Sequence, residues 1–367
     1  MKTQEVKATS FVLGGTLLTM FNNIAGGWAS VIATLIGFII LLIGLNSLKK
    51  MLDDKGNSAL NLIFIAAIIG AVGGLIGWIP IVGLVAGILF LAAFIIQLIG
   101  YLQLKGSAAI GETGAKGANM LFISMIIALV GGIFSLIPGI GGIIAAIVGV
   151  VVLLMIFSGW KNIQMGIIGE DKVKVTAITY ILAGMLIQIG NTAVSGWAAA
   201  IASIIGFVLF LMGLNKLKGT LDEVGQSAVQ LIVIAAYVGI LASVLDFVSG
   251  IVGVGSGLKA ITSGNLGGLA APSTFDMIVA IVFIAAFILE LLGFLKLKGS
   301  EMINEQAKGG ITLLVIAVIL APLANLFSGI LPIGGGFIAS LLGLAGLFLV
   351  LFGWIKVQTS FVETETV

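Results

Sequence analysis

One carboxylate stands well inside an apolar stretch of this chain, within the run Ile-Leu-Glu-Leu-Leu. This residue, Glu290, precedes Lys296 by about two helical turns, and Gln97 occupies the same place in an internal repeat. A charge at membrane depth is costly and by default marks an ion or proton site. Glu290 could therefore carry a proton or a cation, with Gln97 completing the site. Alternatively, it is a protonated or snorkelling side chain that hydrogen-bonds to Gln97 or to a neighbouring helix.

Amide side chains form a second group of candidates. Some stand near the outer ends of the first and seventh apolar stretches, and a repeat-related pair stands near the inner ends of the third and ninth. Amides at such depths usually join helices by hydrogen bonds, and the alternative is a pore lining. The outer set is Asn22, Asn23, Gln188 and Asn191, and the inner pair is Asn61 and Gln230.

An insertion at about 247–271 breaks the repeat. It contains Lys259 and is flanked by Asp246 and Asp276, which together form a candidate outer site. The glycine run 253–257 lacks the preceding strand and the Lys-Ser/Thr ending of a phosphate loop, so no nucleotide site is expected. An outer lid, a re-entrant segment, a docking loop for a partner and a loop without function all remain open.

The residue types that are absent exclude several classes of function. The sequence has no histidine, cysteine or arginine. It therefore lacks the usual nitrogen and sulfur metal ligands, a thiolate or imidazole catalyst and a guanidinium clamp for phosphate. We expect no catalytic residue, cofactor or metal, and hence no enzyme. The net charge of +2 provides no basic face for nucleic acid.

The composition indicates an all-α integral membrane protein. Apolar residues make up 60% of the chain and charged residues 9%, which lies outside the range of soluble globular proteins. Apolar stretches long enough to cross a hydrocarbon core occur about twelve times. They must be helices, because lipid offers no partner to the backbone polar groups of an open sheet.

A short motif recurs near the inner end of every second apolar stretch and predicts six repeated hairpins. The motif is Gly-x-x-x-(Leu/Ile/Val)-(Lys/Gln), and its copies are Gly44–Lys49, Gly100–Lys105, Gly159–Gln164, Gly213–Lys218, Gly293–Lys298 and Gly353–Gln358. Three hairpins also repeat as a block, at an offset of 169 residues (Trp28 to Trp197) and, past the insertion, of about 194 (Gly159 to Gly353). We therefore predict two parallel six-helix halves in tandem, residues 1–168 and 169–367.

The distribution of lysine predicts the orientation. Every lysine except Lys259 falls in the segments that would lie on one side of the membrane. Short lysine-rich loops stay cytoplasmic, so both termini are predicted to be cytoplasmic. The expected location is the cytoplasmic membrane of a prokaryote.

The hairpins resemble uncharacterised multi-pass membrane families known mainly from archaea. The resemblance rests on apolar hairpins that turn at Pro-Gly and end in Gly-x-x-x-Leu-Lys followed by a small acidic stretch, as in Leu48–Gly56 and Leu217–Gly225. It implies the repeated hairpin fold over most of the chain. It implies no activity, so no functional residue is carried over.

Two functions remain. One is a non-enzymatic structural or accessory protein, packed in membrane lipids or docked to a partner membrane protein or to further copies of itself. Uniform apolarity and short loops favour it. The other is a transporter or channel for a small solute, an ion or a proton, with its path between the two halves. Tandem duplication and Glu290 with Gln97 favour that alternative, whereas the scarcity of polar lining speaks against it.

Overall fold

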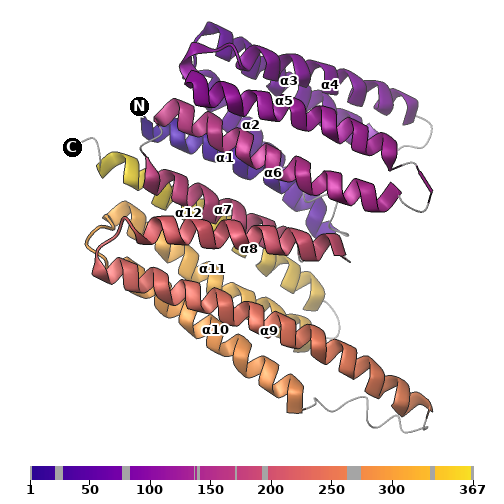
Figure 1. The fold of residues 1–367 in the computed structure, drawn as a ribbon, viewed down its shortest axis with the longest axis vertical. Coiled ribbons are helices and arrows are strands. Elements are labelled where there is room, and N and C mark those ends of the chain that lie inside the picture. The colour runs from indigo at the N-terminus through magenta and orange to yellow at the C-terminus, as the bar shows by residue number, and fades with distance from the viewer. Residues whose placement is uncertain are drawn as a thin grey trace.

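The computed structural model describes residues 2–20, 28–76, 83–135, 137–138, 141–169, 172–191, 197–262, 274–330 and 335–364. Within these ranges all regular secondary structure is helical, and consecutive helices run back and forth along one direction (Figure 1). The elements are α1 (Lys2–Met20), α2 (Trp28–Lys49), α3 (Asp54–Ile76), α4 (Gly83–Leu104), the 3-10 helix η3 (Ala108–Ile110), α5 (Gly111–Phe134), α6 (Gly141–Ile168), α7 (Val173–Asn191), α8 (Trp197–Lys218), α9 (Glu223–Thr262), α10 (Thr274–Lys298), α11 (Glu305–Ile330) and α12 (Gly335–Thr364).

Ten of the described helices are long and apolar enough to cross a membrane, which indicates a multi-pass membrane protein. The sequence predicted about twelve spans, and the two helices that do not meet this criterion are α1 and α7. Each has 19 residues and so reaches about 28 Å at ~1.5 Å per residue. Both are long enough for a hydrocarbon core of about 30 Å. Helix α7 is apolar over Val173–Gln188, whereas α1 is the least apolar of the described helices.

Other helices surround α1 and α7. Both lie in the middle of the molecule, where α1 packs against α2, α6, α7 and α12, and α7 packs against α1, α6, α8 and α12. Val12 and Leu17 of α1 and Ile181 and Leu186 of α7 are fully buried. Because other helices surround α1 and α7, hydroxyl and amide side chains on them can meet protein partners and need not face lipid.

Consecutive helices pack as pairs, and the pairs are arranged along the long axis of the molecule. The pairs are α1 with α2, α3 with α4, α5 with α6, α7 with α8, α9 with α10 and α11 with α12. Figure 1 shows α3, α4 and α5 at one end of the long axis, α9 and α10 at the other, and both chain termini on the same side. We call that side, which also carries Lys49 and Lys218 at the ends of α2 and α8, the lysine-rich side.

The outer helices carry large apolar side chains on their free surfaces. Leu84 and Ile88 of α4 are 81% and 61% exposed, and Ile281 and Ile284 of α10 are 64% and 56% exposed. Exposure of so extensive an apolar surface to water is unfavourable. We assign it to the lipid-facing perimeter.

The insertion at 247–271 begins as a continuation of α9. This helix has 40 residues, Glu223–Thr262, so it includes residues 246–262. Residues 263–271 lie outside the described ranges. At ~1.5 Å per residue α9 is about 60 Å long, twice the thickness of a hydrocarbon core.

The glycine of the recurring motif marks the point where the second helix of each pair touches the first. A β-carbon at any of the six glycines would lie 2.6–3.2 Å from a backbone carbonyl oxygen of the partner helix. That carbonyl always belongs to a small residue. The pairs are Gly44 with Ala8, Gly100 with Ala59, Gly159 with Gly117, Gly213 with Ala177, Gly293 with Ala228 and Gly353 with Gly310. Small residues on both helices let the backbones approach this closely.

We predict that Gly213→Ala destabilises the protein by about 1–3 kcal/mol, the usual cost of overpacking a tight contact. A methyl group at this position would lie 2.6 Å from the Ala177 carbonyl oxygen, and backbone cannot move aside cheaply. Unfolding in detergent, followed by tryptophan fluorescence, measures the change. Gly239→Ala is the matched control, since nothing lies within 4 Å of its added carbon. Equal stability of the two variants would contradict the close-contact account.

Candidate functional site

Four polar side chains from four helices meet in the interior of the molecule, toward the lysine-rich side, and we call them the polar ring. They are Ser10 of α1, Gln164 of α6, Thr179 of α7 and Gln358 of α12. None is more than 3% exposed. Two of the helices come from α1–α6 and two from α7–α12, so the ring joins the two sets of six.

Each hydrogen bond of the ring points the same way around it. Ser10 Oγ donates to Gln358 Oε1 at 2.5 Å, and Gln358 Nε2 donates to Thr179 Oγ1 at 2.7 Å. Thr179 Oγ1 donates to Gln164 Oε1 at 2.7 Å, and Gln164 Nε2 donates to Ser10 Oγ at 3.0 Å. Every hydroxyl and every amide is thus both a donor and an acceptor. Such chains of hydrogen bonds polarise one another and strengthen their members.

The second amide hydrogen of each ring glutamine also has a hydrogen-bond acceptor. Gln358 Nε2 donates to the Val175 carbonyl oxygen at 2.9 Å. Gln164 Nε2 donates to Thr9 Oγ1 at 2.9 Å, and that hydroxyl lies 3.0 Å from the Val6 carbonyl oxygen. Complete pairing matters here, because a buried polar group without a partner costs about 1–3 kcal/mol.

The ring residues stand at the offsets of the repeat that the sequence predicts. Gln164 and Gln358 end the only two copies of the motif that finish in glutamine, and the other four copies finish in lysine. Thr179 follows Ser10 at the offset of 169 residues that relates Trp28 to Trp197. Sequence reasoning did not select these four residues. The replacement of lysine by glutamine in two of six motif copies was the signal that could have found the amides.

The structure does not bring Glu290 and Gln97 together. Gln97 belongs to α4 and Glu290 to α10, which lie at opposite ends of the long axis (Figure 1). Gln97 Nε2 donates to the Tyr101 hydroxyl at 3.0 Å. The residue one turn after Glu290, equivalent to Tyr101, is Phe294, which has no hydroxyl to accept a hydrogen bond. Glu290 has no hydrogen-bond or ion-pair partner within the described ranges.

The inner amide pair contacts lysines on the preceding helix. Lys49 Nζ at the end of α2 donates to Asn61 Oδ1 of α3 at 3.1 Å, and Lys218 Nζ at the end of α8 donates to Gln230 Oε1 of α9 at 2.5 Å. Both amides therefore link consecutive helix pairs at the lysine-rich side.

The outer candidates are described only in part. Asn22 and Asn23 lie outside the described ranges, and Gln188 of α7 packs beside Gly206 of α8. Asn191 is the last residue of α7. Asp246 and Lys259 belong to the extended α9, and Asp276 belongs to the first turn of α10. The side chains of these last four residues are not among those that the structure describes.

Two aspartates form equivalent caps at the lysine-rich side. Asp53 Oδ1 accepts bonds from the Gly56 N–H and the Ser107 hydroxyl, and its Oδ2 accepts from the Ala108 N–H. Asp222 does the same with Gly225, Ser300 and Glu301. Bonds from Ser107 and Ser300, followed by those from backbone N–H groups, hold the pKa of each carboxyl below its usual range. Each aspartate thus caps one helix and ties its turn to the next loop.

The comparisons with known proteins identify no relative. No family model matches the chain, and neither a curated protein nor a solved structure matches it.

We predict that Gln358→Leu lowers the free energy of unfolding by about 1–3 kcal/mol, because it leaves Ser10 and Thr179 short of buried partners. Gln164→Leu does the same, and the double variant loses less than the sum, since either change alone opens the ring. Detergent unfolding of the four proteins gives the cycle. Gln97→Leu, which removes one hydrogen bond near the perimeter, is the control. Additive losses would refute a cooperative ring.

We predict a pH-dependent contribution from the Asp53 cap. Its folded-state pKa lies below the ordinary value of 3.8, so its contribution is complete above that pH and disappears as the pH falls through the lower folded value. Asp53→Ala should cost about 1 kcal/mol at pH 7, typical of a lost helix cap. Melting temperatures of parent and variant, measured from pH 7 to pH 3, should converge at the acid end. A constant difference would contradict this role, and Asp54→Ala serves as control.

Proposed function

We propose that this protein is a non-enzymatic integral membrane protein with a structural or accessory role, either packed in lipid or docked to a partner membrane protein or to further copies of itself. In this proposal α1 and α7 join the ten apolar helices, which makes twelve spans. The lysine-rich side faces the cytoplasm, as short lysine-rich loops favour, and both termini lie there. The membrane is the cytoplasmic membrane of a prokaryote.

The proposal also treats the chain as two parallel repeats of six helices, residues 1–168 and 169–367. The shared glycine contacts support it, because all six motif copies use the same atoms at the same place in their helix pairs. The polar ring supports it as well. A two-fold relation between the halves requires that equivalent residues lie opposite each other in the ring. Ser10 lies opposite Thr179, and Gln164 lies opposite Gln358, as this relation requires.

The filled centre of the molecule is the observation that carries the proposal. Transporters built from repeats bind their substrates between the repeats, near the middle of the membrane. Here the corresponding helices α1, α6, α7 and α12 pack through side chains that are almost fully buried, including Leu17, Trp160, Leu186 and Trp354. The hydroxyl and amide groups of the polar ring are paired with one another, so none of their hydrogens is left for a solute. The Trp160 indole N–H is a buried group of this interface without a partner.

The alternative is a transporter or channel for a small solute, an ion or a proton. One observation favours it. Within the described ranges, the carboxyl group of Glu290 lies inside an apolar span and has no hydrogen-bond or ion-pair partner. Unpaired carboxyl groups within a membrane commonly take part in ion or proton movement. Because Glu290 belongs to α10, which packs against α9 and α11 and contributes no residue to the ring, a path that used it would run beside α10 and not between the halves.

A flux assay distinguishes the two. We predict that liposomes containing the parent leak protons, sodium and potassium no faster than protein-free liposomes, and that Glu290→Gln changes nothing. A fluorescent pH dye and ion-selective dyes give the rates, and an added ionophore shows that the vesicles are intact. Flux from the parent that Glu290→Gln abolishes would refute the structural role. The chain has no cysteine, so a single cysteine at Lys105 reports orientation in the vesicles through an impermeant label.

A further inference from the structure

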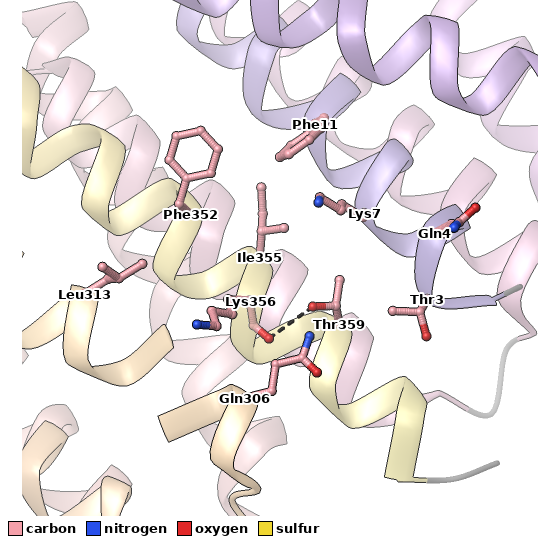
Figure 2. A pocket seen from close by; sticks show the side chains of 10 residues that line it. All are labelled: Thr3, Gln4, Lys7, Phe11, Gln306, Leu313, Phe352, Ile355, Lys356 and Thr359. Atoms are coloured by element: carbon pink, nitrogen blue, oxygen red, sulfur yellow. Dashed lines mark hydrogen bonds between the residues drawn. The ribbon is translucent and has the colours of Figure 1, made fainter. Parts of the chain in front are cut away.

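A groove of about 490 Å³ opens on the lysine-rich side between α1, α11 and α12. Since α12 packs against both α1 and α11, it lies between these two helices and forms the bottom of the groove. Figure 2 shows the side chains that line it, with Phe11 and Phe352 toward one end and Lys356 and Gln306 toward the other.

The polarity of the groove changes along the helix axes. On α1, Lys7 is one turn closer to the lysine-rich side than Phe11, and on α12, Lys356 is one turn closer than Phe352. The rings of Phe11 and Phe352 meet edge to face at 6.1 Å between centroids. The groove is therefore cationic at its mouth and aromatic deeper in the membrane.

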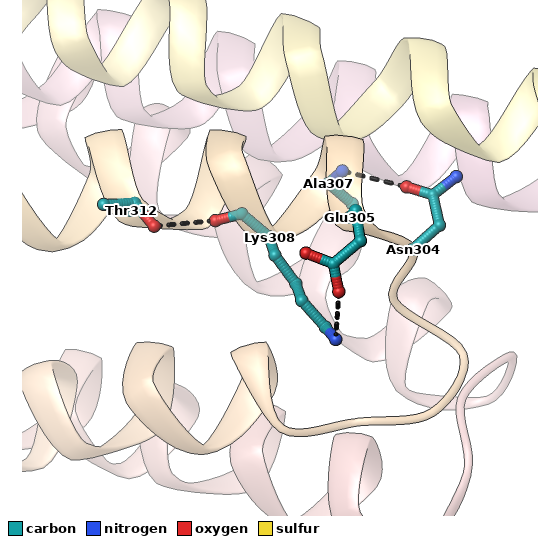
Figure 3. Close-up of polar contacts among 5 residues, drawn as sticks. All are labelled: Asn304, Glu305, Ala307, Lys308 and Thr312. Atoms are coloured by element: carbon teal, nitrogen blue, oxygen red, sulfur yellow. Dashed lines mark hydrogen bonds and ion pairs between the residues drawn. The ribbon is translucent and has the colours of Figure 1, made fainter.

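The charge of the two lysines is not compensated locally. Both are exposed, and neither has a carboxylate partner in the part of the chain that the structure describes. No acidic residue lines the groove. Glu305, at the start of α11, already pairs with Lys308 at 2.7 Å, as Figure 3 shows. The mouth thus presents two ammonium groups without a carboxylate partner to an anion, and that of Lys7 also lies 5.7 Å from the centroid of the Phe11 ring.

We propose that this groove binds one anionic phospholipid from the leaflet on the lysine-rich side. Lys7 and Lys356 hold its phosphate, Gln306 offers a further hydrogen bond, and an acyl chain follows Phe11, Phe352 and Leu313. A free phosphate ion would use only the mouth, whereas Phe352, which is 42% exposed, continues the apolar surface toward the lipid. The site stands whether the protein is structural or a transporter, so it goes beyond the proposed function.

The repeat-related place between α5, α6 and α7 has different chemistry. At the offset of 169 residues, the position equivalent to Lys7 is occupied by Thr176. At the offset of 194 residues, the position equivalent to Lys356 is occupied by Asn162. The lysine that lies nearby, Lys161, is engaged with Tyr180, to whose hydroxyl oxygen its Nζ donates at 3.2 Å. We therefore expect one such lipid in each chain and not two.

Native mass spectrometry of the detergent-purified full chain tests the site. The parent is mixed with phosphatidylglycerol, with phosphatidylcholine of equal chain length, or with inorganic phosphate. We expect phosphatidylglycerol to be retained as a single adduct in clear preference to phosphatidylcholine, with no phosphate adduct. Each lysine near an anionic lipid contributes about fivefold to affinity, so Lys7→Gln/Lys356→Gln should lower phosphatidylglycerol retention by roughly tenfold or more.

Lys50→Gln/Lys116→Gln is the matched control, because it removes the same charge from two exposed lysines that do not line the groove. This control should retain phosphatidylglycerol as the parent does. The proposal is overturned if the parent shows no preference for phosphatidylglycerol, if the groove variant keeps the preference, or if the control loses it equally. If the parent binds inorganic phosphate, shows no preference for phosphatidylglycerol, and loses phosphate binding in the groove variant, the groove is an anion site and not a lipid site. Thermal melting shows that both variants are folded.

Discussion

Lipid offers a hydroxyl or amide no hydrogen-bond partner, and this constraint organises the whole molecule. The protein places many of its polar side chains either in turns and caps at the lysine-rich side or in the interior between the two sets of six helices, where they pair with one another. Glu290 of α10 follows neither solution. The polar ring is the result of the second solution. Ser10, Gln164, Thr179 and Gln358 satisfy each other, while the outer helices α4 and α10 keep their large apolar side chains toward lipid.

The central helices combine the two kinds of contact. Other helices surround α1 and α7, and each contributes one hydroxyl to the polar ring. Within each pair of consecutive helices, a glycine faces a small residue at the point of closest contact. Together these two features hold the array of helices that the structure describes.

The helical fold and the pairs of helices could be predicted from the sequence, because apolar length and a recurring Gly-x-x-x-Leu-Lys motif report directly on what lipid and close contact require. The centre could not. Nothing in the apolar pattern shows that α1, α6, α7 and α12 are neighbours, and Ser10 and Thr179 look like ordinary hydroxyl residues in apolar helices. Glu290 is an isolated carboxylate in an apolar stretch, which made it a candidate site residue. The expectation that it meets Gln97 assumed that equivalent positions of the predicted repeat are close in space. The equivalent positions of the predicted repeat meet on the central helices, as in the ring, whereas those on α4 and α10 lie at opposite ends of the long axis.

The ring also sets an order for the assembly of the chain. Ser10 precedes Gln358 by 348 residues. The Gln164–Ser10 bond can form once α6 has been inserted, and the Thr179–Gln164 bond once α7 has been inserted. Ser10 and Thr179 must then wait for α12, which supplies one partner to each. Until α12 is inserted, each of these two hydroxyls lacks one of its ring partners, so insertion of α12 is the event that closes the ring.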